Sequence, residues 1–150
     1  MIREQADTHI DRSVDVVFAY MTDIGRFPEW STVVQEATLT SSGPLGVGST
    51  FRTTAHFLGR RFQTDNVVTV YDPPHTFAGK VTSGPVQYEV TTTLQPEDGG
   101  THVTWAIEGE PAGFFRVAEP LLARLGRRQI EAQVGTLKDL LEAEDAEGAK

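Results

Sequence analysis

The side chains that could carry chemistry in this chain are few, and they form no recognised catalytic set. The chain has no cysteine, which excludes disulfides, thiolate nucleophiles and cysteine-ligated metals. It also lacks the GxSxG pattern of a hydrolase nucleophile. We expect solvent exposure for the scattered histidines, His9, His56, His75 and His102. They form no HExxH motif, so the sequence predicts no metal site.

A glycine-rich segment, GPLGVG at residues 43–48, is similar to a phosphate-binding loop in composition only. It lacks the GK[ST] ending and the following helix whose N-terminus would bind phosphate. We therefore interpret the segment as a hairpin loop. The sequence predicts no cofactor.

General acid–base catalysis is the chemistry that the sequence leaves open. Such chemistry needs little more than a shaped cavity, a positioned polar group and a base. Tyr88, Asn66 and Asp65 lie nearest to the predicted pocket, but Asp65 is out of phase and should face solvent. We identify no inward-pointing acidic residue, which weakens the case for an enzyme. An inward Asn66 requires hydrogen bonds, which a ligand or a trapped water would supply.

The one basic cluster consists of Arg116, Arg124, Arg127 and Arg128, on or near the last predicted helix. A solvated helix face explains such a cluster. Alternatively, Arg116 lies nearest the predicted pocket mouth and would bind a ligand carboxylate through its planar guanidinium.

The hydrophobic pattern predicts the elements that would position these groups. Residues 2–10 alternate as a half-buried strand, and a short helix capped by Ser13 follows. A second short helical stretch runs from Asp23 to Trp30 and is limited by Pro28. Turn signals then separate six further strands, near residues 33–40, 49–57, 61–71, 76–82, 86–95 and 102–108. Their short connections predict consecutive antiparallel hairpins.

The strand alternation predicts an inward face of aromatic, aliphatic and small polar side chains. Its members are Phe51, Thr53, Ala55, Phe57, Phe62, Thr64, Asn66, Val68, Val70, Val86, Tyr88, Val90, Thr92, Leu94, Val103, Trp105 and Ile107.

One long helix is predicted from about Ala112 to Glu142, with an irregular apolar stripe and a kink at Pro120. Residues 143–150 read as a frayed acidic tail. A sheet that wraps one helix has more concave area than the helix covers, so we expect a pocket at one end, with mainly apolar walls. The candidate ligand-binding residues are Trp30, Phe51, Thr53, Phe62, Thr64, Asn66, Tyr88, Thr92, Trp105, Phe114, Arg116, Val117 and Leu121.

Length and charge bound the possible functions. A chain of 150 residues fits one domain, 1–150, with a sizeable core. The net charge of -8 argues against nucleic-acid binding, because phosphate recognition depends on Lys and Arg. The sequence shows neither a signal-peptide pattern nor a membrane-length apolar run, so we expect a cytoplasmic protein without stable membrane insertion. Monomer and homodimer both stay open.

The segments IDRSVDVVFAYMTDIGRFPEW, VGSTF, VVTVYDPPHTF, GTHVTW and LKDLLE occur in an order that resembles the START-like superfamily. The likeness is to its polyketide cyclase/dehydrase and lipid-transport branch, with the Bet v 1-like helix-grip fold, and it covers nearly the whole chain. It implies an α+β fold in which a seven-stranded curved antiparallel sheet wraps a long C-terminal helix, with two short helices between the first two strands.

The resemblance also implies a pocket for an apolar or aromatic molecule. Our leading hypothesis is the binding of a small hydrophobic, lipid- or polyketide-like ligand in an internal cavity. The alternatives are a polyketide cyclase or aromatase that needs no metal, and a protein-interaction module whose cavity is filled by side chains.

Overall fold

The computed structural model describes residues 2–31, 33–57, 59–111 and 119–148. Within these ranges seven strands form one antiparallel sheet in the order β1-β7-β6-β5-β4-β3-β2. The strands are β1 (Ile2–Ile10), β2 (Val34–Leu39), β3 (Thr50–Phe57), β4 (Arg60–Asp72), β5 (Thr76–Ser83), β6 (Val86–Glu97) and β7 (Gly100–Pro111). The helices are α1 (Val14–Met21), the 3-10 turn η1 (Ile24–Arg26), α2 (Phe27–Trp30) and α4 (Glu119–Gly148).

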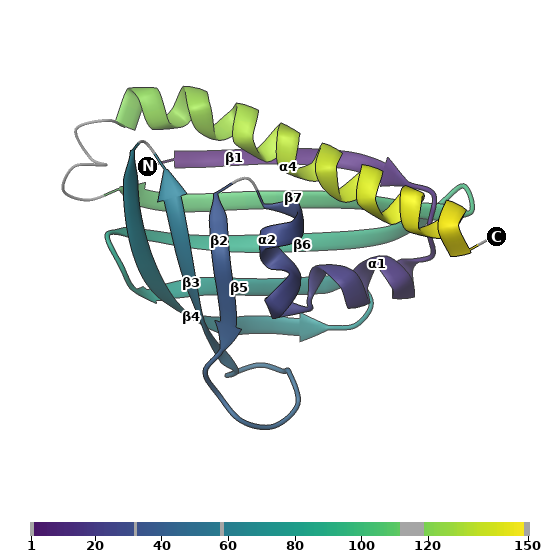
Figure 1. The fold of residues 1–150 in the computed structure, drawn as a ribbon, viewed down its shortest axis with the longest axis horizontal. Coiled ribbons are helices and arrows are strands. Elements are labelled where there is room, and N and C mark those ends of the chain that lie inside the picture. Colours follow the sequence, from purple (N-terminus) through teal and green to yellow (C-terminus); the bar gives the residue numbers. More distant parts are fainter. Residues whose placement is uncertain (1, 32, 58, 112–118, 149–150) are drawn as a thin grey trace.

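The sheet curls around its helices. Figure 1 shows β2 and β3 running nearly crosswise to β1, β7 and β6, while α4 extends beside β1. In the same view α1 lies toward the C-terminal end of α4 and α2 lies nearer its middle. This arrangement confirms the predicted α+β helix-grip fold. No helix among the described residues is long and apolar enough to cross a membrane.

Local sequence explains the start of the helical segment. Ser13 has an extended backbone, and its side chain accepts a hydrogen bond from the Val16 amide at 3.4 Å, as an N-cap does. The stretch after Asp23 divides into η1 and α2. Pro28 lies in the first turn of α2, where a missing N–H costs no helical hydrogen bond.

A β-bulge corrects one part of the predicted inward face. Val68 pairs with Gly79, but Val70 pairs with Ala78, so the register of β4 on β5 shifts between them. The extra residue reverses the sheet faces on which the following side chains of β4 lie. Val70 is therefore exposed, contrary to the prediction, and Tyr71 packs against the core in its place.

The last helix differs from its predicted bounds. It runs to Gly148, through most of the segment that we expected to be frayed. Pro120 is the second residue of α4, and the residues before Glu119 fall outside the described ranges, so the kink at Pro120 stays a prediction. The predicted start, from Ala112, falls outside the described residues.

The core divides along α4. Leu137 and Leu141, in its C-terminal half, are fully buried in the main cluster with residues of α1, α2 and the sheet, among them Phe18 and Leu94. Ile130, in the N-terminal half of the helix, belongs to a smaller cluster on β1 and β7. The smaller cluster leaves space for a cavity.

Two of the predicted exposed histidines are exposed, His56 and His75. The side chains of His9 and His102 are only 31% and 30% exposed. They are cross-strand partners on β1 and β7, and both contact the carboxylate of Glu97, at 3.1 Å and 3.2 Å.

Further carboxylates complete this surface cluster. His9 Nε2 lies 3.1 Å from Asp11 and His102 Nε2 lies 3.0 Å from Asp7. The hydrogen bond to Asp11 is the main cause that raises the pKa of His9, and Glu97 adds to it. Alternation alone could not predict these pairs, because it places a side chain on a face without naming its cross-strand neighbours.

Candidate functional site

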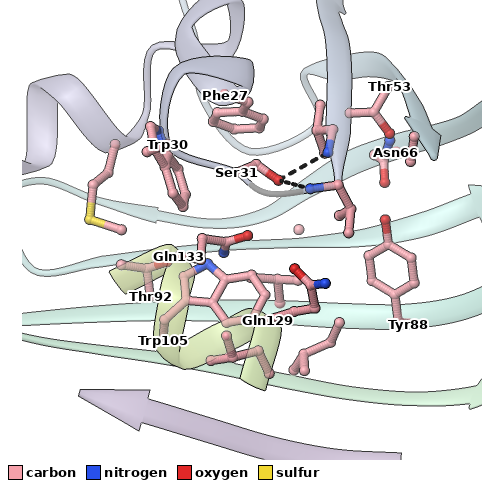
Figure 2. Close-up of a pocket in the computed structure, with 18 of the residues that line it drawn as sticks. Phe27, Trp30, Ser31, Thr53, Asn66, Tyr88, Thr92, Trp105, Gln129 and Gln133 are labelled. Atoms are coloured by element: carbon pink, nitrogen blue, oxygen red, sulfur yellow. Dashed lines mark hydrogen bonds between the residues drawn. The ribbon is translucent and has the colours of Figure 1, made fainter. Parts of the chain in front are cut away.

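A cavity of about 260 Å³ lies between the N-terminal half of α4, the inner face of the sheet and α2. Figure 2 shows side chains from these elements converging on it. Eight of the predicted site residues line the cavity: Trp30, Phe51, Thr53, Phe62, Asn66, Tyr88, Thr92 and Trp105. The walls are otherwise mainly apolar, with Phe27, Phe77, Val90 and Ile107 among the additional contacts.

The remaining predicted residues divide into two groups. Thr64 is buried but is not among the cavity-lining residues, and its hydroxyl contacts Thr53 Oγ1 at 2.5 Å. Phe114, Arg116 and Val117 fall outside the described residues, and Leu121 belongs to the first turn of α4. Asp65 points to the other side of the sheet as predicted, where it accepts a hydrogen bond from Arg52 at 2.8 Å.

Asn66 and Tyr88 form the polar end of the cavity. The Asn66 amide nitrogen donates to the Phe51 and Thr64 carbonyl oxygens at 3.3 Å and 3.2 Å, which leaves its own carbonyl oxygen as an acceptor. Burial raises the pKa of Tyr88, and a hydrogen bond with Thr64 opposes that shift in part. The phenol is therefore protonated at neutral pH and can donate. Figure 2 shows the Tyr88 hydroxyl directed toward Asn66.

An aromatic cluster forms the wall near α2. The rings of Phe27 and Trp30 meet edge to face at 5.7 Å, and Phe27 meets Phe51 in the same way at 5.8 Å. Trp30 is 6% exposed, and its indole nitrogen has no hydrogen-bond partner among the described residues. Ser31, which follows it, accepts hydrogen bonds from the Val33 and Val34 amides and so fixes the chain into β2.

Two polar residues on α4 were not predicted as part of the site. Gln129 and Gln133 are one turn apart, and both side chains line the cavity. Gln133 is 6% exposed. The sequence could have indicated both residues. Gln133 is three positions after the core residue Ile130, and Gln129 is four positions before Gln133, so they share the buried face of the helix.

A third omission is Glu4 on β1, whose side chain is 11% exposed and lines the cavity. Our expectation that no acidic residue points inward is therefore wrong. Glu4 shares the phase of Ala6 in the alternation of β1, so the pattern already contained the signal. Its carboxylate lies 3.3 Å from Arg127 Nε.

The basic cluster faces water where it is described. Arg124, Arg127 and Arg128 are exposed, as a solvated helix face requires. None of them lines the cavity, so Glu4 is the only charged side chain of the described lining. The described residues contain no group of three or more histidines and carboxylates that could hold a metal ion.

Comparison with known proteins places this geometry in a family. The profile of the family described as polyketide cyclase/dehydrase and lipid transport matches residues 1–142. The chain belongs to that family. A search of the curated proteins found no match.

Solved structures of this family's fold superpose closely at low sequence identity. A protein from Thermus thermophilus is 18% identical with a TM-score of 0.81, covering 95% of this chain and 98% of its own. A START superfamily protein from Mycobacterium smegmatis is 14% identical with a TM-score of 0.80, covering 94% and 97%.

A third relative is a two-domain protein. The di-domain ARO/CYC of the steffimycin biosynthetic pathway is 13% identical with a TM-score of 0.75, covering 97% of this chain and 52% of its own. At these identities the likeness establishes the fold alone.

Proposed function

We propose that this polyketide cyclase/dehydrase and lipid-transport family member binds a small hydrophobic or aromatic molecule in its internal cavity. The observation that carries the proposal is the cavity of about 260 Å³, with aromatic walls and few polar groups. Such composition is usual for small-molecule sites. A filled interior would have favoured a protein-interaction module, and the open volume argues against that alternative.

The volume limits the ligand. Sites for drug-sized molecules start at roughly 300 Å³, so this cavity suits a compact molecule on the order of two to three fused rings. A long acyl chain does not match the broad aromatic surfaces of Phe27, Trp30 and Trp105. We therefore expect planar ring systems to bind better than extended lipids.

The two tryptophans of the chain supply a direct assay, because both Trp30 and Trp105 line the cavity. The neutral dye N-phenyl-1-naphthylamine should quench their fluorescence and gain its own emission on binding. Val90→Phe fills the cavity and should abolish this signal. Val70→Phe makes the same change at the exposed bulge and should leave it unchanged.

Saturable dye binding that Val90→Phe removes would support the proposal. Absence of binding to the wild-type protein, or equal binding by both variants, would refute it. Unfolded variants are recognised by circular dichroism before titration.

A second candidate function is ring-closing catalysis, which the family's cyclase members and the combination of Glu4 with Tyr88 favour. An aldol-type closure needs a base for the proton on the carbon beside a carbonyl and a donor for the developing oxyanion. Glu4 would accept the proton and Tyr88 would donate. Turnover of a poly-β-ketone substrate, lost in Glu4→Gln and Tyr88→Phe with binding retained, would establish catalysis; binding without turnover would exclude it for that substrate.

Three broader expectations stay proposals: a single domain over residues 1–150, a cytoplasmic location, and a monomeric or homodimeric state. Limited proteolysis, cell fractionation and light scattering during size-exclusion chromatography test them in that order. A protease-resistant fragment much shorter than the chain, secretion or a larger oligomer would each overturn one of them.

A further inference from the structure

Gln133 is a buried polar side chain that the fold does not satisfy. It is 6% exposed, no hydrogen bond joins its carboxamide to another described residue, and its polar atoms are not among the fully covered ones that lack a partner, so they border the cavity. Figure 2 shows the carboxamide directed into the cavity. Its helical neighbours Ile130 and Val134 pack against Ala6, so the backbone at Gln133 is held by core contacts on either side.

A carboxamide that faces a mainly apolar cavity needs a partner there, because native proteins nearly always satisfy polar groups that they withdraw from bulk water. The group both donates and accepts hydrogen bonds. An occupant that satisfies it must therefore present an acceptor and a donor close together. Apolar surface alone cannot do so.

Glu4 limits the charge of the occupant. Its carboxylate lines the cavity, whereas its partner Arg127 is 70% exposed on the solvent side of the pair. The described lining contains no positive side chain. A ligand carboxylate in the cavity would lie near a like charge in a medium of low dielectric constant, where repulsion is strong.

We propose that the cavity selects a neutral aromatic ligand carrying an amide-like donor–acceptor group, which Gln133 recognises, and that Glu4 excludes carboxylates. This inference rests on the proposed function and adds the chemical class of the ligand. It differs from the expectation that Arg116 binds a ligand carboxylate, since it predicts the opposite preference.

The test uses four probes on one ring system: naphthalene, 2-naphthol, 2-naphthamide and 2-naphthoate. Each displaces N-phenyl-1-naphthylamine from the full-length protein at neutral pH, where only 2-naphthoate is charged. We expect 2-naphthamide to bind on the order of tenfold more tightly than 2-naphthoate.

Variants separate the two contacts. Gln133→Leu should lower the affinity for 2-naphthamide by on the order of tenfold and leave the affinity for naphthalene unchanged, because only the amide probe loses hydrogen-bond partners. Gln133→Met serves if the leucine variant does not fold. Gln95→Leu makes the same change at an exposed position of β6 and should alter neither affinity.

Glu4→Gln should raise the affinity for 2-naphthoate to within about threefold of the affinity for 2-naphthamide, since the like charge is removed. Two controls break an ion pair and keep the cavity carboxylate. Arg127→Gln frees Glu4 from its partner, and Glu108→Gln breaks the exposed pair with Arg3. Both should continue to exclude 2-naphthoate.

The proposal is supported if Gln133→Leu selectively loses affinity for 2-naphthamide and Glu4→Gln gains affinity for 2-naphthoate. It is overturned if the wild-type protein binds 2-naphthoate as tightly as 2-naphthamide, or if Gln133→Leu weakens all four probes equally. Saturable dye binding with no such selectivity would retain the proposed function and reject only this inference. If the dye does not bind to the wild-type protein, both the proposed function and this inference are rejected.

Discussion

Truncation of Leu137 tests whether the C-terminal half of α4 anchors the helix independently of the cavity. Leu137 is fully buried in the main core cluster, whereas Leu140, on the same helix, is 36% exposed. Leu→Ala in a core costs about 2–5 kcal/mol through lost transfer free energy and the void left behind. We expect about 3 kcal/mol for Leu137→Ala and no more than about 1 kcal/mol for Leu140→Ala.

Urea denaturation measures these costs as shifts of the midpoint at a constant slope. For a domain of this size the larger cost corresponds to a melting temperature lower by roughly 6–12 °C. Dye affinity well below that temperature should not change, because Leu137 is not among the cavity-lining residues. Equal costs for the two leucines would refute the division of the core, and a lost dye signal in folded Leu137→Ala would refute its independence from the cavity.

Other perturbations test the sheet, the helix and the surface histidines. A Cβ at Gly109 would lie 2.7 Å from Tyr88 Cβ, so Gly109→Ala should lower both stability and dye binding; Gly135→Ala meets open space in a helix and should stabilise by about 0.5–1 kcal/mol in urea titrations. Because the pKa of His9 is raised, its stabilisation is full below its ordinary value of 6.5 and is lost as pH rises through the folded value. The wild-type melting temperature should therefore fall between about pH 6 and about pH 8 more than that of His9→Gln; identical profiles would contradict this. Val68→Ala should cost about 2 kcal/mol and Val70→Ala less than about 0.5 kcal/mol, and equal costs would exclude the bulge.

Alternation predicted most of the sheet because each strand buries one face. It failed at Val70, since a bulge adds one residue and reverses the faces beyond it. No residue type in VVTVYD marks that bulge. Only the pairing with β5 defines it, and pairing between strands is not encoded locally.

Polar residues of the site were predicted unevenly for a similar reason. Asn66 and Tyr88 stood out because they interrupt apolar strand faces. Glu4 and Gln133 also lie on inward faces, but charged and amide side chains at such positions are commonly solvated at an element's edge. Their burial depends on α4 meeting β1, a contact between opposite ends of the chain.

The cavity is where this sequence departs from the most stable packing of its fold. The C-terminal half of α4 buries Leu137 and Leu141 completely, yet one to two turns earlier the helix carries Gln133 and borders an open volume. Both the open volume and the amide that faces it lower stability relative to an apolar side chain that fills the space. Stability alone does not explain the open volume and Gln133, because substitutions that fill a cavity with apolar side chains commonly stabilise a protein. The open volume and Gln133 lie in the half of the helix that borders the cavity with Tyr88 and Asn66. The ligand that we propose, in contact with both polar sites, would account for that arrangement.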